Sequence, residues 1–281
     1  MPKHKFSDQD ENKIVESYRN GSSMEELRKE YSCGTIKPIK RVLLSHNIQL
    51  RSNDECIRKY TADYHYFDNI DTPNKAYMLG FLYADGCNYM NDKNYIYHWY
   101  VELKDEDEAL LKRMMEEIKY NGVIKHTERK DQYGHRRSSQ FWVCNHHMCS
   151  SLASWGVVPN KTSCAKYPER LNDELLPHFI RGLLDGDGCI DKNGSVSICG
   201  TFDLIDSLKT KIENVFDIHW CLYKYNNDAH TATISNRSKR VIEFLDWTYK
   251  DADLKLDRKY NRYLEMQNAN AIERKQKKVY V

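Results

Sequence analysis

Apolar residues recur at helical spacing in three short stretches of residues 1–50. Ser7 is a candidate N-cap for the first stretch. The second and third stretches cover residues 24–31 and 36–45, with Ser32-Cys33-Gly34 as a tight turn between them. We therefore predict a small all-α domain over residues 1–50 that contains a helix-turn-helix.

The third predicted helix carries polar and basic residues outside its apolar stripe, namely Thr35, Lys37, Lys40 and Arg41. The second helix of such a motif reads the major groove, so these residues are candidates for contacts with double-stranded DNA. A three-helix bundle that contacts protein fits the same pattern. Residues 51–74 are polar and irregular, which is typical of a linker, although Tyr66 and Phe67 are apolar enough to pack on the following domain.

The chain from residue 75 to about residue 265 has the pattern of one unit repeated. Each copy opens with an apolar helix that ends in Asp-Gly, at Asp85-Gly86 and at Asp187-Gly188. In the first copy, the hydrophobic period then predicts strands over residues 95–103, 123–130 and 139–144 and helices over 105–120 and 147–155. In the second copy, it predicts strands over residues 195–199, 219–225 and 230–234 and helices over 202–216 and 238–249. The predicted fold class is α+β, with two pseudo-symmetric αββαββα repeats at residues 75–168 and 169–281.

Small residues lie four apart in both opening helices, as Gly80 with Ala84 and as Gly182 with Gly186. This spacing lets two helix backbones approach closely. We expect Gly86 and Gly188 to end the helices in the left-handed conformation.

Asp85 and Asp187 then fall at helix C-termini, where the helix dipole disfavours a carboxylate. Two such ends side by side would repel each other unless divalent cations lie between them. Carboxylate and carbonyl oxygens favour Mg²⁺. The plainer interpretation, in which each Asp-Gly is only a helix stop, explains one copy better than two in matching context.

The stretches Met78–Gly86 and Ile180–Gly188 resemble the two signature motifs of LAGLIDADG homing endonucleases. The resemblance spans about residues 75–265 and implies a saddle-shaped sheet surface that lies on DNA. It implies metal binding by Asp85 and Asp187 together with the carbonyl oxygens of Ala84 and Gly186, and hydrolysis of both strands across the minor groove with 3′ overhangs. Tyr83 departs from the motif, at a position that holds no metal in that family.

The family also has a basic residue after the last helix of each unit, and Lys161 and Lys259 match that place. A lysine near the scissile phosphate would stabilise developing negative charge and help to order the attacking water. Lys255 and Arg258 compete with Lys259 for this role, and a solvated surface lysine is the alternative at either position.

The strand predicted at residues 95–103 alternates in polarity, with His98, Tyr100 and Glu102 opposite Tyr97, Trp99, Val101 and Leu103. We expect the first set to face DNA, although a register shift of one residue would exchange the two faces. Further candidates for phosphate or base contacts are the basic residues Lys125, Arg129, Arg136 and Arg137.

The formal net charge is only +2, so contact with DNA must use local basic patches. None of the nine cysteines forms a Cys-x-x-Cys pair, and Cys144–Cys149 lacks the second pair of a zinc finger. The first residues, Met-Pro-Lys-His-Lys, lack the apolar region of a signal sequence, and no apolar run is long enough to span a membrane. We therefore expect a soluble, cytoplasmic or nucleoid-associated protein with reduced thiols, and an organelle is a second option.

Two other functions fit the same scaffold, a non-catalytic DNA-binding regulator and an RNA-splicing maturase. The paired Asp residues argue against a pure binder, and the helix-turn-helix favours duplex DNA over RNA. Both units lie in one chain, so we expect a monomer on DNA without a protein partner. An intein is not expected from the terminal residues, and the basic run Arg274–Lys278 is typical of a frayed tail.

Overall fold

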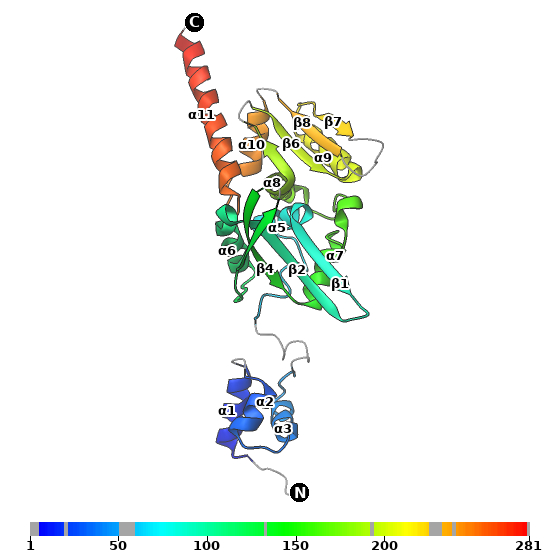
Figure 1. Ribbon diagram of the computed structural model, residues 1–281, viewed down its shortest axis with the longest axis vertical. Helices are drawn as coiled ribbons and strands as arrows, with labels where there is room; N and C mark the ends of the chain where they lie inside the picture. The colour runs from blue at the N-terminus through cyan, green and yellow to red at the C-terminus, as the bar shows by residue number, and fades with distance from the viewer. Residues whose placement is uncertain are drawn as a thin grey trace. The chain divides into compact units, whose positions relative to one another are not determined.

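The computed structural model describes residues 6–19, 22–50, 60–131, 134–191, 194–224, 232–237 and 240–279, with side chains to residue 270 in the last helix. The chain forms two compact units that divide after Lys59. Figure 1 shows the elements of both. In the described part of the chain, no helix is long and apolar enough to cross a membrane.

The first unit contains the three predicted helices, α1 (Asp8–Arg19), α2 (Met24–Glu30) and α3 (Lys37–Ser45). Apolar side chains from all three form a core of their own, centred on Ile14, Leu27 and Ile39. Ser7 accepts a hydrogen bond from the Asp10 amide at 3.1 Å, so it caps the first helix as expected.

Two details at the starts of α2 and α3 refine the prediction. Ser23 is the N-cap of α2 and forms a capping box with Glu26. α3 starts one residue later than predicted, with Ile36 as its N-cap and Pro38 in its first turn. Thr35 still accepts a hydrogen bond from the Lys37 amide at 3.4 Å.

The second unit starts at Tyr60, within the predicted linker of residues 51–74. Residues 60–72 pack against the first repeat, where Phe67 is fully buried. The Phe67 carbonyl accepts a hydrogen bond from the Trp155 indole at 2.9 Å, and the Asp63 amide donates to Ile118 at 2.7 Å. Burial of the Tyr66 and Phe67 rings attaches this segment to the repeat, although most of its other residues are polar.

Both repeats have the predicted order αββαββα. The first comprises α5 (Pro73–Ala84), β1 (Gly86–Asn91), β2 (Ile96–Lys104), α6 (Glu108–Glu117), β3 (Lys125–Asp131), β4 (Gly134–Val143) and α7 (His146–Ser154). The second comprises α8 (Leu176–Asp187), β5 (Gly188–Ile190), β6 (Val196–Gly200), α9 (Phe202–Val215), β7 (Cys221–Lys224), β8 (Ala232–Asn236) and α10 (Val241–Tyr249). Each forms a four-stranded antiparallel sheet, in the orders β1-β2-β4-β3 and β5-β6-β8-β7. The predicted fold class is confirmed.

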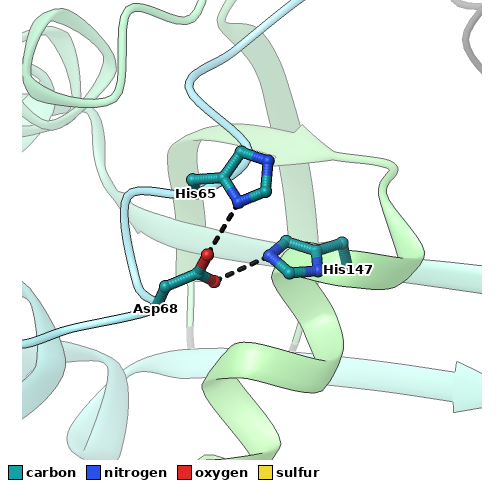
Figure 2. A group of neighbouring side chains, drawn as sticks. All are labelled: His65, Asp68 and His147. Atoms are coloured by element: carbon teal, nitrogen blue, oxygen red, sulfur yellow. Dashed lines mark hydrogen bonds and ion pairs between the residues drawn. The ribbon is translucent and has the colours of Figure 1, made fainter.

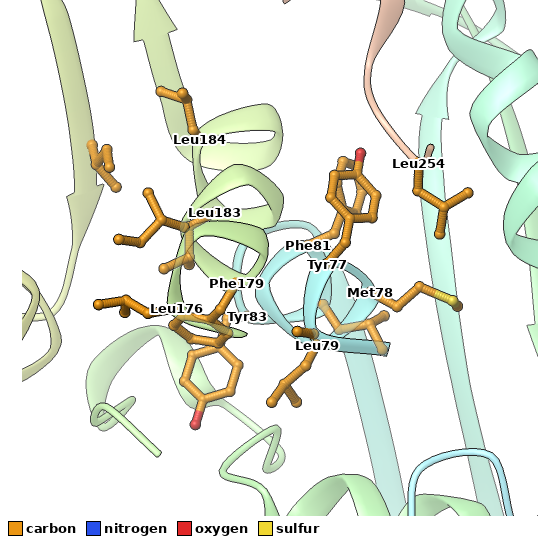
Figure 3. Close-up of a cluster of buried hydrophobic side chains, with 14 of the residues drawn as sticks. Tyr77, Met78, Leu79, Phe81, Tyr83, Leu176, Phe179, Leu183, Leu184 and Leu254 are labelled. Atoms are coloured by element: carbon orange, nitrogen blue, oxygen red, sulfur yellow. The ribbon is translucent and has the colours of Figure 1, made fainter. Parts of the chain in front are cut away.

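The opening helices α5 and α8 pack against each other, and the small residues make this possible. A Cβ on Gly80 would lie 2.0 Å from the Phe179 carbonyl oxygen, and a Cβ on Gly182 would lie 2.1 Å from that of Tyr77. Figure 3 shows Met78 and Leu183 on the sides of the two helices that face away from this contact. The buried apolar residues of both repeats form one continuous core, which includes the contact between α5 and α8.

The conformation expected for Gly86 and Gly188 is wrong. Both are the first residues of strands, and Gly188 has φ −91° and ψ 170°. Glycine is needed there for space, because a Cβ on either residue would lie 2.7 Å from the Cα of the leucine four positions earlier. The strand turns back directly over the last helical turn.

The C-terminal region also differs from the prediction of a frayed tail. Helix α11 runs from Asp257 to Val279 and includes the backbone of the basic run. Its first turns pack against the core through Tyr260 and Tyr263. Arg258 donates to the buried Asp107 carboxylate at 3.0 Å, which fixes the start of α11 against the first repeat.

Candidate active site and nucleic-acid interface

The two motif carboxylates lie at neighbouring helix ends. Asp85 is the C-cap of α5, and Asp187 is the last residue of α8. The close packing of α5 on α8 brings these ends together, and a Cβ on Gly186 would lie 2.2 Å from the Ala84 Cβ and 3.4 Å from Asp85 Oδ2. A pocket of about 170 Å³ beside Asp187 is lined by Ala84, Lys161 and Gly200, among others. Solvent therefore reaches the space beside Asp187 at the helix ends.

The surroundings of the pair disfavour its negative charge. Both side chains have solvent-exposed surface, but protein atoms crowd around them and exclude much of the water. This desolvation raises the pKa of Asp85 and of Asp187, and repulsion from Asp187 raises the pKa of Asp85 further. The positive charges of Lys161 and Lys259 partly oppose both shifts.

Each helix end also holds one of the two predicted lysines. Lys161 Nζ donates to the Ala84 carbonyl at 3.0 Å. Lys259 Nζ lies within hydrogen-bond distance of four carbonyl oxygens at the α8 end, including those of Gly186 at 3.0 Å and Gly188 at 2.7 Å. Desolvation lowers the pKa of both ammonium groups, that of Lys259 to about 8.

The competitors of Lys259 have other partners. Lys255 donates to the Ala252 carbonyl at 2.9 Å, and Arg258 is bonded to Asp107. Of the three basic residues, Lys259 is the one that contacts the end of α8.

Two residues that hold the lysine-bearing segments were not singled out from the sequence. The Tyr83 hydroxyl donates to the Trp155 carbonyl at 2.6 Å and lies 3.1 Å from the Lys166 carbonyl, and these two residues flank Lys161 in the sequence. The buried Asp185 carboxylate, at the matching position of α8, accepts from the Leu256 amide at 2.7 Å, just before Lys259. The departure of Tyr83 from the motif was the one sequence signal for this position. Tyr83 and Asp185 occupy matching positions of the two helices, and each holds the segment that carries a lysine.

Tyrosine hydroxyls complete the surroundings of Asp185. Tyr77 donates to it at 2.9 Å and Tyr249 at 2.7 Å. Burial raises the pKa of Asp185, and these hydrogen bonds oppose that shift. An opening helix, a closing helix and the lysine segment therefore meet at one carboxylate.

The predicted alternation of β2 is confirmed. Trp99, Val101 and Leu103 are buried, while His98, Tyr100 and Glu102 lie on the open face of the sheet. The register places Cys87, Tyr89, Trp142, Gln140, Lys125, Arg129 and Arg136 on the same open face. Burial lowers the pKa of His98, so its ring is neutral at pH 7 and offers hydrogen bonds rather than charge.

Arg137 differs from its neighbour Arg136. It pairs with Glu128 across the ladder, and its Nε donates to that carboxylate at 3.2 Å. Because successive strand residues point to opposite faces, Arg137 lies on the face opposite to that of Arg136.

The open face of the second sheet has different chemistry. Among its described strand residues, the positions on this face are Cys189, Ser197, Cys199, Cys221, Tyr223, Thr233 and Ser235. None of them is charged, whereas the open face of the first sheet carries basic and aromatic residues. The two repeats thus share a backbone plan and differ in the surface they present.

The remaining sequence candidates lie on the first unit or near α7. Thr35, Lys37, Lys40 and Arg41 are all exposed on and just before α3. The Cys144–Cys149 stretch forms no zinc knuckle within the described residues, because Cys149 is buried in the core while Cys144 is exposed.

Comparisons with known proteins support the fold by structure only. No protein-family model matches the chain, and no curated protein matches it in sequence. The LAGLIDADG homing endonuclease I-GzeII, solved in complex with its DNA target, is 12% identical with a TM-score of 0.50, and the match covers 73% of this chain and 92% of that chain. This chain has the LAGLIDADG fold.

Two further solved structures match a similar share of this chain. The meganuclease I-AabMI bound to uncleaved DNA is 13% identical with a TM-score of 0.48, over 73% of this chain and 92% of that chain. I-DmoI in complex with DNA and Ca is 15% identical with a TM-score of 0.44, over 69% and 93%.

Proposed function

We propose that this chain is a site-specific endonuclease that hydrolyses both strands of duplex DNA with a divalent metal and leaves 3′ overhangs. The observation that carries the proposal is the pairing of Asp85 with Asp187 at adjoining helix ends, each beside a buried lysine. A scaffold that only binds DNA has no use for two neighbouring carboxylates whose pKa values are both raised by desolvation. I-GzeII, which has the same fold, was solved with its DNA target.

The residues at the helix ends fit a hard cation such as Mg²⁺. Asp85 and Asp187 supply carboxylate oxygens, and Ala84 and Gly186 supply carbonyl oxygens next to them. Each of these carbonyls accepts one lysine hydrogen bond and has a second lone pair. Desolvation of the carboxylates favours a bound cation, because the cation offsets their charge.

A bound divalent cation would lower the pKa of attacking water and neutralise charge on the reacting phosphate. The protein's own residues prepare the place for that chemistry. Asp85 and Asp187 hold the cation, while Lys161 and Lys259 supply fixed positive charge where the phosphate gains negative charge. Tyr83 and Asp185 act as positioning residues, since they hold the segments that carry the lysines.

The open sheet faces are proposed to lie on the DNA. On the first sheet, Lys125, Arg129 and Arg136 would contact phosphates, and His98 and Tyr100 would contact base edges. The described strand residues on the open face of the second sheet, among them Ser, Thr and Cys, would read its half-site without charge. Because the two faces differ, we propose that one protein monomer, without a protein partner, binds a non-palindromic site.

The test is cleavage of a library of random duplexes by the full chain. With Mg²⁺, we expect double-strand cuts at one recurrent sequence with ends that carry 3′ overhangs, and no cuts with excess chelator. Sequencing of the product ends measures both. Binding of a specific duplex without cleavage in any divalent metal would favour the regulator, and selective binding of structured RNA would favour the maturase.

The first unit is proposed to bind DNA beside the cleavage site through α3. Deleting residues 1–59 is expected to shorten the protected footprint while the cleavage positions stay unchanged. Each lost phosphate contact should reduce the slope of log K against log salt by about 0.9. Footprinting and salt titration of both proteins measure these changes. An unchanged footprint and slope would mean that the unit contacts protein or serves only the fold.

The matched control for this deletion is a triple variant of the full chain, Lys37→Gln with Lys40→Gln and Arg41→Gln. These side chains are exposed, so the helical core should remain intact. We expect the triple variant to reproduce the weaker salt dependence and to keep the fold of the unit.

A further inference from the structure

A second group of potential metal ligands lies on other elements of the second unit. His65 and Asp68 belong to the segment before α5, and His147 belongs to the first turn of α7. Figure 2 shows both imidazoles pointing at the Asp68 carboxylate. His65 Nδ1 lies 2.7 Å from Asp68 Oδ2, and His147 Nε2 lies 2.7 Å from Asp68 Oδ1.

The dimensions of this group suit a transition metal. One ligand atom from each residue lies within 4.8 Å of the other two. Tetrahedral zinc, with bonds of about 2.0–2.1 Å, needs ligand atoms about 3.3 Å apart. The side chains of His65 and His147 are 75% and 49% exposed, so both have room to rotate toward that spacing.

The carboxylate is also oriented by a neighbouring hydroxyl. Ser151 Oγ donates to Asp68 Oδ1 at 2.6 Å. A hydroxyl that orients a ligating carboxylate is a common support of metal sites.

We propose that His65, Asp68 and His147 form a Zn²⁺ site, with water in the fourth position. Two imidazoles and one carboxylate favour zinc over Mg²⁺ or Ca²⁺, which prefer all-oxygen sites. The site would tie the segment that follows Lys59 to α7 of the first repeat. A bound ion would therefore hold residues 65–68, near the start of the second unit, against the first turn of α7.

The site is a tertiary feature. His147 lies within the Cys144–Cys149 stretch, but its partner Asp68 is 79 positions away in sequence. Its neighbours take no part, since the His146 ring packs against Tyr97 and Cys149 is buried.

The test is Zn²⁺ binding by the full chain carrying Asp85→Asn and Asp187→Asn, which removes the proposed catalytic cations from the measurement. Zn²⁺ is titrated in competition with a chromophoric chelator, and Co²⁺ is added separately to record its visible spectrum. We expect one Zn²⁺ per chain and a tetrahedral Co²⁺ spectrum. Replacing one ligand, as in His147→Gln or His65→Gln, should weaken binding by at least about tenfold.

The matched control is His146→Gln, an exposed histidine one position away. It should bind Zn²⁺ as the background protein does. Zn²⁺ should also raise the Tm of the background protein and of the control but not of His147→Gln, because a ligand of the native state stabilises it. Circular dichroism of each variant establishes that it is folded.

Two results would overturn the proposal. One is an octahedral Co²⁺ spectrum in the background protein, which would mean that no tetrahedral site exists. The other is a Zn²⁺ affinity that His65→Gln and His147→Gln leave unchanged in folded protein. Either outcome would reduce the group to a hydrogen-bonded clasp between the segment and α7.

Discussion

Asp85→Asn and Asp187→Asn are each expected to lower double-strand cleavage by about 10³-fold or more while duplex binding stays near wild type. Each carboxylate is proposed to hold cations, and an amide oxygen carries no charge to replace it. The variants should fold, because both side chains have solvent-exposed surface at the helix ends. Single-turnover cleavage and gel-shift binding on the same duplex measure the two effects.

The matched control is Asp206→Asn, an exposed carboxylate on α9. It should cleave at the wild-type rate. Full cleavage by the double variant Asp85→Asn with Asp187→Asn, or by the wild type in excess chelator, would contradict the proposed mechanism. Binding lost together with cleavage would instead point to a structural role for the carboxylates.

The second large effect is expected from Gly182→Ala, which should destabilise the second unit by about 3 kcal/mol. The added Cβ would lie 2.1 Å from the Tyr77 carbonyl oxygen and 2.5 Å from the Phe81 amide nitrogen. These are backbone atoms of a packed helix, so α5 and α8 would have to separate. At this size the Tm should fall by about 6–12 °C.

Thermal unfolding followed by circular dichroism checks this result. Gly34→Ala is the control, because a Cβ there meets no atom within 4 Å. It should change the stability of its own unit by less than about 1 kcal/mol. A Gly182→Ala protein as stable as the wild type would mean that the two helices do not pack as closely as described.

Local pattern was sufficient for the elements and for the duplication. Hydrophobic period distinguishes helix from strand because burial of one face requires it, and two Asp-Gly motifs in matching context predicted two repeats. The alternation in β2 likewise separated Trp99 and Val101 from His98 and Tyr100 before any strand pairing was known. The lysines after each repeat were found through family resemblance rather than through pattern.

Register and fine geometry needed the folded chain. Arg136 and Arg137 lay outside the predicted strand 139–144, and only the folded chain, in which β4 starts at Gly134, places them on opposite faces of the sheet. The sequence was also misleading at Gly86 and Gly188, where close packing over the preceding helical turn, and not a left-handed conformation, requires glycine.

The choice of Lys259 over Lys255 and Arg258 came from tertiary contacts, as did the roles of Tyr83 and Asp185. The same is true of His65, Asp68 and His147, which three-dimensional packing brings together from two separate segments. Periodicity records which face of an element is buried, because that property is local. Periodicity does not indicate which residues that are distant in sequence come into contact. The partners in each site were therefore decided by tertiary packing.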